Sequence, residues 1–407
     1  MTRSRSSIST KSCLLACCGC LLWSASARSQ DISEGVQIHG FVSQSLVHTT
    51  DNNVGGNSDD DIAWDLREMG ANLSWRPSPD WLVSPQALAR WAGASDEGDL
   101  RLDYGFVDHT FHADGENQYG IRLGKVKNPY GFFNTTRDVA HTRPGILLPQ
   151  AVYIDELRNT FLAAPGASLN GIHFFEDSQL EWTFNAVRPE VDAKSLTRYM
   201  ATNFPGHFEG RTSWLGQALW ERDGGSWRAG LTLGNIKMAY EPASVRDLAP
   251  GRIALHTGVL SLERNMASWS LTGEYARINQ IRGGFLPSVP NAALDKDTTV
   301  EAAYLQSSWR FRPRWRAYLR YEVLYLDRND RNGREFQSLP GGAGVPNIQR
   351  FSRDKVVGLR YDPTTAWALS AEFHDVDGTA WLPRIDNPAP EMERRWQMLL
   401  LQAAWRF

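Results

Sequence analysis

The sequence RRWQMLLLQAAWRF, residues 394–407, decides the fold because its side chains alternate in character along its length. One side of an extended chain would carry Leu399, Leu401, Ala403, Trp405 and Phe407. The opposite side would carry Leu400, Gln402, Ala404 and Arg406. Successive side chains of a β-strand point to opposite faces, so this segment predicts a strand with lipid on one side and a polar interior on the other.

The same alternation recurs through the chain. It is equally clear between Trp315 and Tyr325, where the odd positions are all apolar or aromatic and the even positions include three charged residues. Counting every candidate segment predicts sixteen strands,. They lie at about 36–48, 62–76, 81–92, 100–112, 118–127, 168–176, 178–187, 211–222, 226–238, 253–264, 267–278, 298–311, 314–327, 350–362, 365–376 and 392–407.

The connections between these segments carry independent information because they alternate between short and long. The short ones are rich in Pro, Gly, Asp and Asn, as at 76–80, 114–117 and 223–225,. The longest is 128–167. Outer-membrane barrels have an even number of strands, tight periplasmic turns and longer external loops. The alternative, a soluble β-sandwich or propeller, would neither need this parity nor collect large apolar residues on its solvent face. The sequence therefore predicts an all-β chain that forms a transmembrane antiparallel β-barrel.

The N-terminus predicts export. Three basic residues precede an apolar run from Cys13 to Trp23, and the small residues Ala25-Ser26-Ala27 follow it. This order is typical of a secretory signal, so we expect a signal peptide at 1–27 and a barrel domain at 28–407. A lipoprotein cleavage box at Cys17 is the alternative at this end. All four cysteines lie between residues 13 and 20, so the mature chain would have none.

Composition limits the classes of function. Cleavage after residue 27 removes three of the 43 basic and none of the 46 acidic residues, which leaves a net charge of −6. The chain therefore lacks the basic excess that would indicate a nucleic acid as partner. The nine histidines are scattered without metal-binding spacing, and no Gly-x-Ser-x-Gly or phosphate-binding loop is present,. We therefore expect no catalytic residues, no metal and no cofactor, and an outer-membrane hydrolase remains only a third hypothesis.

The connection 128–167 is the predicted constriction of the pore. A segment of about forty residues without strands in a compact protein is usually functional. Charges of both signs lie close together in and beside it, and in a narrow passage they would favour polar or ionic solutes. The alternative is an external loop with solvated charges. The predicted constriction and selectivity residues are Lys125, Lys127, Arg137, Asp138, Arg143, Asp155, Glu156 and Arg158.

The same region resembles a known family. The run RLGKVKNPYGFFN at 122–134, with Thr136-Arg137-Asp138-Val139, Thr142-Arg143-Pro144 and Leu147-Leu148-Pro149-Gln150, is similar to porin-like outer-membrane proteins of proteobacteria. These are akin in architecture to the phosphate-selective porins. The resemblance implies a sixteen-stranded barrel, often trimeric, whose third loop folds inward. It does not carry over phosphate selectivity, because the sequence has no strong basic ladder beyond the suggestive lysines at 125 and 127.

Strand parity also places charged residues on the inner wall. The residues predicted to line the lumen are Arg122, Arg316, Arg320, Glu322 and Arg360. Two interpretations stay open for them: an arginine track for anions opposed by carboxylates, or ion pairs and hydrogen bonds that stiffen the wall.

Taken together, the sequence predicts an outer-membrane porin, a passive diffusion channel for small hydrophilic solutes or ions. The alternative is a plugged barrel that acts as a surface-binding or assembly scaffold. Phe407 and Trp405, at the very end of a one-sided strand, predict a signal read by the barrel-assembly machinery through strand pairing. The other expected partners are outer-membrane lipid and lipopolysaccharide, and a homotrimer follows from the resemblance alone.

Overall fold

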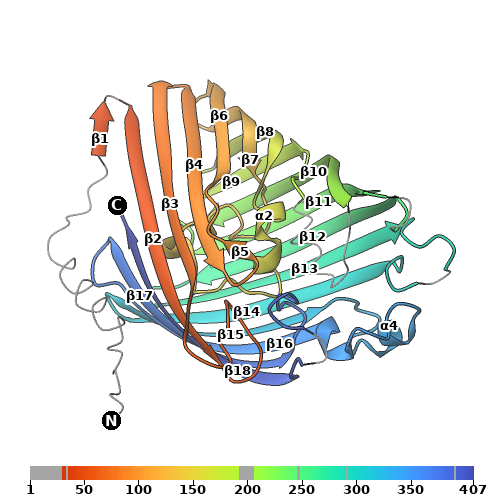
Figure 1. Ribbon diagram of the computed structural model, residues 1–407. Coiled ribbons are helices and arrows are strands. Elements are labelled where there is room, and N and C mark those ends of the chain that lie inside the picture. The colour runs from red at the N-terminus through yellow and green to blue at the C-terminus, as the bar shows by residue number, and fades with distance from the viewer. Residues whose placement is uncertain (1–29, 34, 192–205, 245–247, 290–291, 389–390) are drawn as a thin grey trace, which may run out of the picture.

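The computed structural model describes residues 30–33, 35–191, 206–244, 248–289, 292–388 and 391–407 (Figure 1). Sixteen of its strands form the wall of a barrel. These are β2 (Val36–Thr49), β3 (Ala63–Ser78), β4 (Trp81–Ala92), β6 (Arg101–Ala113), β7 (Asn117–Lys127), β8 (Ala163–Phe174), β9 (Ser178–Val187), β10 (Gly206–Arg222), β11 (Trp227–Pro242), β12 (Gly251–Asn265), β13 (Trp269–Gly283), β14 (Thr298–Arg312), β15 (Trp315–Tyr325), β16 (Phe351–Tyr361), β17 (Trp367–Gly378) and β18 (Arg395–Arg406).

The wall closes on itself. Each strand pairs antiparallel with its neighbour in sequence, and β18 pairs antiparallel with β2, with Leu401 opposite Leu46. The backbone of Phe407 continues this seam, since its N–H donates to the carbonyl of Gly40 at 3.0 Å. The ribbon in Figure 1 shows the resulting ring. Closure pairs the backbone N–H and C=O groups that would otherwise be exposed at a sheet edge, and a sheet surrounded by lipid requires this pairing. The predicted sixteen-stranded antiparallel barrel is confirmed.

Two further short strands add to the wall without belonging to the ring. β1 (Gln30–Ser33) pairs with β2, and β5 (Asp96–Glu97) pairs with β4. Neither was predicted, because four and two residues are too few to show a period,.

The two faces of the wall differ as the alternation predicts. On β18, Leu399 and Leu401 are 45% and 44% exposed, whereas Leu400 between them is fully buried. Across the sheet, exposed tryptophans gather beside the short turns, and several stack on a neighbouring strand, as Trp269 does on Trp309 with 5.4 Å between ring centroids. An apolar outer band edged by aromatic residues is the surface that lies against lipid in a membrane barrel.

The strand ends differ from the prediction on the long-loop side. β10 begins five residues earlier than expected, at Gly206, and β11 and β13 run on to Pro242 and Gly283. β8 begins at Ala163 rather than 168, so the long connection is 128–162 and not 128–167. The segment Ala163–Ala167 contains Pro165 and Gly166 and shows no alternation, which hid this strand end,.

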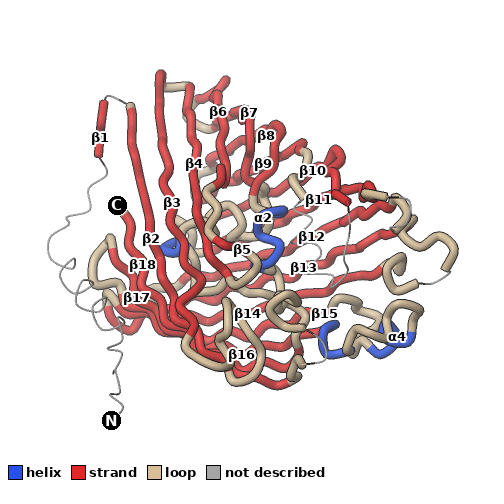
Figure 2. Tube along the Cα trace, in the orientation of Figure 1, coloured by secondary structure: helices blue, strands red, loops and turns tan. Residues whose placement is uncertain are grey.

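Seven short connections of two to five residues alternate with the longer ones, as predicted. The tubes in Figure 2 show longer loop segments lying within the ring of strands. Among the described residues, no helix is long and apolar enough to cross a membrane. The predicted signal peptide at 1–27, with Cys17, lies outside the described residues.

Candidate functional site

The connection between β7 and β8 contacts the inner face of strands on the far side of the barrel. It holds three short helical turns, η2 (Ala140–Thr142), η3 (Asp155–Leu157) and α2 (Arg158–Phe161), and is called here the third loop. Its backbone N–H groups donate to three glutamates on alternate strands, Glu274 on β13, Glu322 on β15 and Glu372 on β17. All three side chains are at most 3% exposed and belong to the buried face of the wall.

Glu274 holds the first part of the third loop. Its carboxylate accepts hydrogen bonds from the backbone N–H of Phe132 at 2.8 Å and from the hydroxyl of Tyr153 at 2.5 Å. The wall supplies two more donors, the hydroxyls of Ser261 at 2.5 Å and Tyr304 at 2.8 Å. A buried carboxylate with four donors is fully satisfied, so this contact fixes the loop to β12, β13 and β14.

Glu372 and Glu322 hold the middle of the third loop. Glu372 accepts from the backbone N–H groups of Ile146 at 2.8 Å and Leu147 at 3.2 Å. Glu322 accepts from the N–H of Ala151 at 2.8 Å and pairs with Arg320 at 3.0 Å. The loop therefore spans the barrel from β7 to β17.

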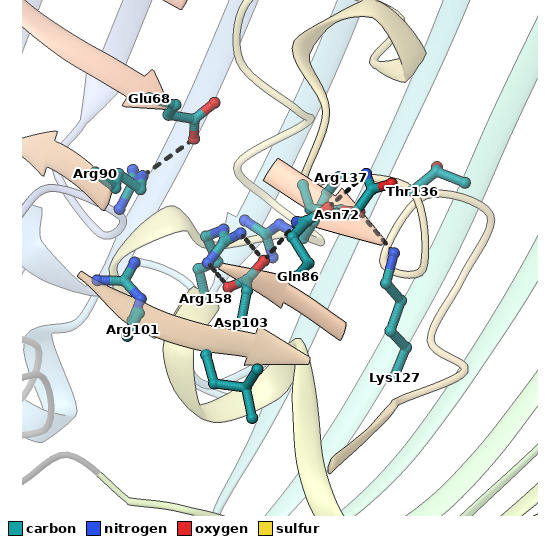
Figure 3. Close-up of polar contacts among 12 residues, drawn as sticks. Glu68, Asn72, Gln86, Arg90, Arg101, Asp103, Lys127, Thr136, Arg137 and Arg158 are labelled. Atoms are coloured by element: carbon teal, nitrogen blue, oxygen red, sulfur yellow. Dashed lines mark hydrogen bonds and ion pairs between the residues drawn. The ribbon is translucent and has the colours of Figure 1, made fainter. Parts of the chain in front are cut away.

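On the near side, the third loop joins the wall through a cluster of paired charges (Figure 3). Arg158 donates both terminal nitrogens to Asp103 of β6, each at 2.9 Å, and the two residues are 2% and 4% exposed. Arg90 of β4 pairs with Glu68 of β3 at 3.3 Å and also with Asp155 of the loop. Bidentate pairing of this kind fixes both distance and orientation.

Three further loop residues complete this charge cluster. Arg143 pairs with Glu68 at 2.5 Å, and Arg137 pairs with Asp155 at 3.3 Å. Asp138 accepts from Lys127 at 2.9 Å and from Gln86 at 2.9 Å. Nearly every charge therefore faces an opposite charge, and the cluster carries little net charge toward the lumen.

The electrostatics of the loop residues follow from this pairing. Burial alone would raise the pKa of Asp155, but the guanidinium groups of Arg90, Arg137, Arg143 and Arg158 outweigh it and lower that pKa to about 2,. Burial lowers the pKa of Arg137 to about 10, with Asp155 opposing the shift and neighbouring arginines adding to it. Both groups remain charged at neutral pH.

Six of the eight predicted constriction residues come together in this cluster: Lys127, Arg137, Asp138, Arg143, Asp155 and Arg158. Lys125 lies apart from them, paired with Glu190 at 2.6 Å and donating to the carbonyl of Leu102 at 3.1 Å. Glu156 accepts a hydrogen bond from Ser95 at the edge of the cluster. The role of the eight predicted residues in selectivity stays a prediction.

The wall partners Arg90 and Asp103 were missing from the predicted site. Both lie on strands where the alternation is weak, and Asp103 is followed by the buried Tyr104, so parity did not assign their faces. Arg90 is the one charged residue of β4, and a charge within such a strand is costly unless a partner is present; β6 carries several charged residues, so Asp103 did not stand out,.

The predicted lumen-wall residues divide into two kinds. Arg320 is buried and paired with Glu322, which fits the stiffening interpretation. Arg122 pairs with Asp108 at 2.7 Å, and its side chain is 36% exposed. Arg360 pairs with Asp362 at 2.8 Å and donates to the loop carbonyls of His141 and Arg143. The side chain of Arg316 has no hydrogen bond or ion pair among the described residues.

Below the third loop, toward the short turns, a second group of carboxylates lies on the wall. Glu221 of β10 and Glu263 of β12 flank Arg228 of β11, at 2.6 and 3.0 Å, and Glu181 of β9 lies beside them. The Arg228 guanidinium stacks 4.8 Å above the ring of Phe132, a third-loop residue, which places this group on the inner face. Among the described residues, no group of His, Cys, Asp and Glu could hold a metal ion.

Comparison with known proteins identifies the fold. No family model and no curated protein sequence matches the chain. Among solved structures, it is similar to the anion-selective porin from Comamonas acidovorans, at 10% identity over 91% of this chain and 99% of that one, with a TM-score of 0.55. It is also similar to Salmonella typhi OmpF in complex with daunomycin, at 10% identity over 92% and 98% of the chains, with a TM-score of 0.55. The trimer form of in-vitro folded OmpT, an outer-membrane protein of Vibrio cholerae, aligns at 10% identity over 91% and 99%, with a TM-score of 0.53. At these identities the likeness shows a shared barrel fold.

Proposed function

We propose that the protein is a porin-like channel of the bacterial outer membrane, through which small hydrophilic solutes or ions diffuse passively. The observation that carries this proposal is the state of the inward-facing charges below the third loop. The side chains of Arg122, Arg228 and Glu221 are 36%, 27% and 29% exposed although they lie on the inner face. Charged groups keep this exposure only where water reaches them, which supports a wet lumen beside the loop.

The third loop would then narrow the passage rather than fill it. Its anchors lie on β13, β15 and β17 and on β3, β4 and β6, so the loop crosses the lumen between these two walls. The eight residues from Lys125 to Arg158 are proposed to set the constriction, chiefly by holding the loop in place. Lys125 and Lys127 have side chains that are each 20% exposed and are the ones proposed to act directly on passing ions.

The comparisons add indirect support. One similar structure is described as an anion-selective porin and another as an outer-membrane protein in a trimer form, and both span nearly the full chain. Placement in the outer membrane, contact with lipid and lipopolysaccharide, and a homotrimer are proposed for this chain by that analogy. The exposed apolar band and its tryptophans suit the membrane placement,.

Export and assembly complete the proposal. Residues 1–27 would be removed as a signal peptide. Phe407 and Trp405 would be read by the barrel-assembly machinery, and their rings are in tilted contact at the seam, with 5.1 Å between centroids. Removing Phe407 should slow assembly without changing the stability of barrels already formed, which pulse labelling of folded and unfolded forms can follow.

Liposome swelling tests the channel itself. Vesicles containing the folded protein are diluted into neutral sugars of increasing size, and the swelling rate is followed by light scattering. We expect fast swelling with small sugars and a sharp decline as sugar size rises. Vesicles that stay intact in the smallest sugar, with folded protein present, would instead favour the plugged-barrel scaffold.

A further inference from the structure

Four arginines lie on the inner wall between β14 and β18, close to the short turns. They are Arg310 on β14, Arg316 on β15, Arg360 on β16 and Arg406 on β18, and are called here the basic rim. The chain between β14 and β15 reads RFRPRWR at 310–316, which places two of them on either side of one tight turn. Strand parity puts each on the inner face, since Trp309, Leu359 and Trp405 occupy the outer one; Arg310 and Arg406, near the strand ends, are exposed.

Strand pairing brings Arg310, Arg316 and Arg360 of the basic rim close together, and Arg406 lies farther along the rim on β18. Arg316 and Arg360 are direct partners in the β15–β16 ladder. Arg310 lies in the irregular stretch of the β14–β15 ladder between the pairs Trp309–Ala317 and Arg312–Trp315, close enough to act electrostatically on Arg316. Like charges directly opposite one another on the same face destabilise a sheet. Such an arrangement requires compensation from an opposite charge or a function that needs the positive potential.

The compensation within the protein is small. Asp362 pairs with Arg360 at 2.8 Å, and among the described residues it is the carboxylate that acts most strongly on Arg316. The next carboxylate deeper on this wall, Glu372, is already bonded to the third loop and to Tyr318 and His374. The side chain of Arg316 is half-buried and has neither a hydrogen bond nor an ion pair among the described residues. Its guanidinium donors face the lumen unused.

The neighbouring part of the wall, β9 to β12, has the reverse character. Glu181, Glu221 and Glu263 surround Arg228 at the same end of the barrel, and Arg122 acts on Glu181 as well. A solute in this part of the lumen would meet carboxylates on one side and guanidinium groups on the other. An anion is therefore drawn to the basic rim rather than spread evenly through the lumen.

We infer that the basic rim is a binding site for a small oxyanion, a carboxylate or phosphate group carried by a permeating solute, with Arg316 as its principal ligand. The inference rests on the proposed function insofar as the occupant is a permeating solute. Guanidinium groups match oxyanions because two N–H donors on one plane meet two oxygens. Arg316 and Arg360 carry such groups at directly paired positions of neighbouring strands.

A binding measurement that does not depend on conductance tests this site. The full-length folded protein in neutral detergent is titrated with inorganic phosphate in constant potassium chloride, and binding is followed by ³¹P NMR line width and calorimetry. We expect saturable binding to the wild type. Arg316→Gln should weaken it about tenfold, as the loss of one charge-assisted contact predicts, and Arg316→Lys should lie between the two.

Arg228→Gln is the matched control. It removes the same charge from the same end of the lumen, but from an arginine that two glutamates already engage. We expect it to leave phosphate affinity within about twofold. Equal weakening by Arg228→Gln and Arg316→Gln would mean that diffuse charge, not a site, attracts the anion, and would overturn the inference. So would a wild-type protein that binds no phosphate.

Two additions separate the other possibilities. Adding phosphatidylglycerol tests the source of the oxyanion: lipid that displaces phosphate from the wild type would assign the rim to a headgroup and overturn the solute assignment. The same preparations are examined for conductance in potassium chloride alone. Conductance without phosphate binding would overturn the anion site and leave the proposed channel function standing. Phosphate binding without conductance would overturn the channel function and leave the anion site standing.

Discussion

Arg158→Met should release the third loop from the wall while leaving the barrel folded. Arg158 and Asp103 form a bidentate pair in which both residues are at most 4% exposed. Methionine keeps much of the length but leaves Asp103 as a buried charge with Gln86, at 3.2 Å, as its remaining donor. Removing one partner of a buried pair costs about 3–5 kcal/mol. Undocking of the loop relieves this cost, because Asp103 then faces water.

The expected size of the effect follows from that cost. A penalty of about 3–5 kcal/mol raises the ratio of undocked to docked loop by roughly 100- to 4000-fold. Trypsin cleavage after Arg137 reports this ratio, since Arg137 is 4% exposed when the loop is docked, and cleavage of a transiently opened segment follows its equilibrium population. Gel mobility with and without heating verifies that the barrel itself remains folded.

Two variants control this experiment. Arg122→Met breaks a pair within the wall, with Asp108, and should not change cleavage after Arg137. The double variant Arg158→Met with Asp103→Leu should restore protection, because an apolar replacement of both partners removes the uncompensated charge. The reasoning is refuted if Arg158→Met cleaves at the wild-type rate, or if the double variant cleaves as fast as the single one.

Three further predictions test other contacts. Replacing both Lys125 and Lys127 with Glu should move the reversal potential under a salt gradient toward cations, while Lys355→Glu on the outer face should not, and no shift would remove both lysines from the ion path. Burial and the nearby Arg406 and Arg360 lower the pKa of His141 to about 4, so a released loop, with an ordinary pKa near 6.5, binds more protons between these values,. Lowering the pH through this window should therefore favour release of 140–142 and increase current fluctuations, an increase that His141→Gln should abolish. Gly358→Ala should destabilise the barrel by about 1–3 kcal/mol in urea unfolding because a Cβ there overlaps the ring of Tyr318, whereas Gly283→Ala, with open space, should change stability little,.

The sequence predicted the ring of strands because the membrane imposes a strict alternation wherever lipid faces the wall. At the long-loop ends of the strands, beyond the lipid-facing band, the polar side chains lie on the outer face and the apolar ones on the inner face. On β11, Lys237 and Glu241 lie on the outer face, while Met238 and Tyr240 pack inside. Because the apolar side chains there point inward, the alternation no longer matches that of the lipid-facing part of the strand. The predicted strand therefore stopped at 238.

The residues of the third loop were predicted better than their arrangement. Mixed charge in a long connection singled out Arg137, Asp138, Asp155 and Arg158. Their wall partners were missed, because Arg90 lies 65 positions before Asp155 and Asp103 lies 55 positions before Arg158 along the chain. Pairing between a loop and distant strands depends on the closed ring, which one-dimensional spacing does not encode. The anchoring of backbone N–H groups by Glu274, Glu322 and Glu372 was equally hidden, because a backbone donor leaves no mark in the sequence.

Single-channel recording in a planar bilayer tests the central claim most directly, that a closed ring of strands keeps a water-filled path beside its anchored loop. The wild-type protein should give stable current steps, and a chain lacking residues 132–160 should give larger ones. A folded wild-type barrel that carries no current would contradict the claim.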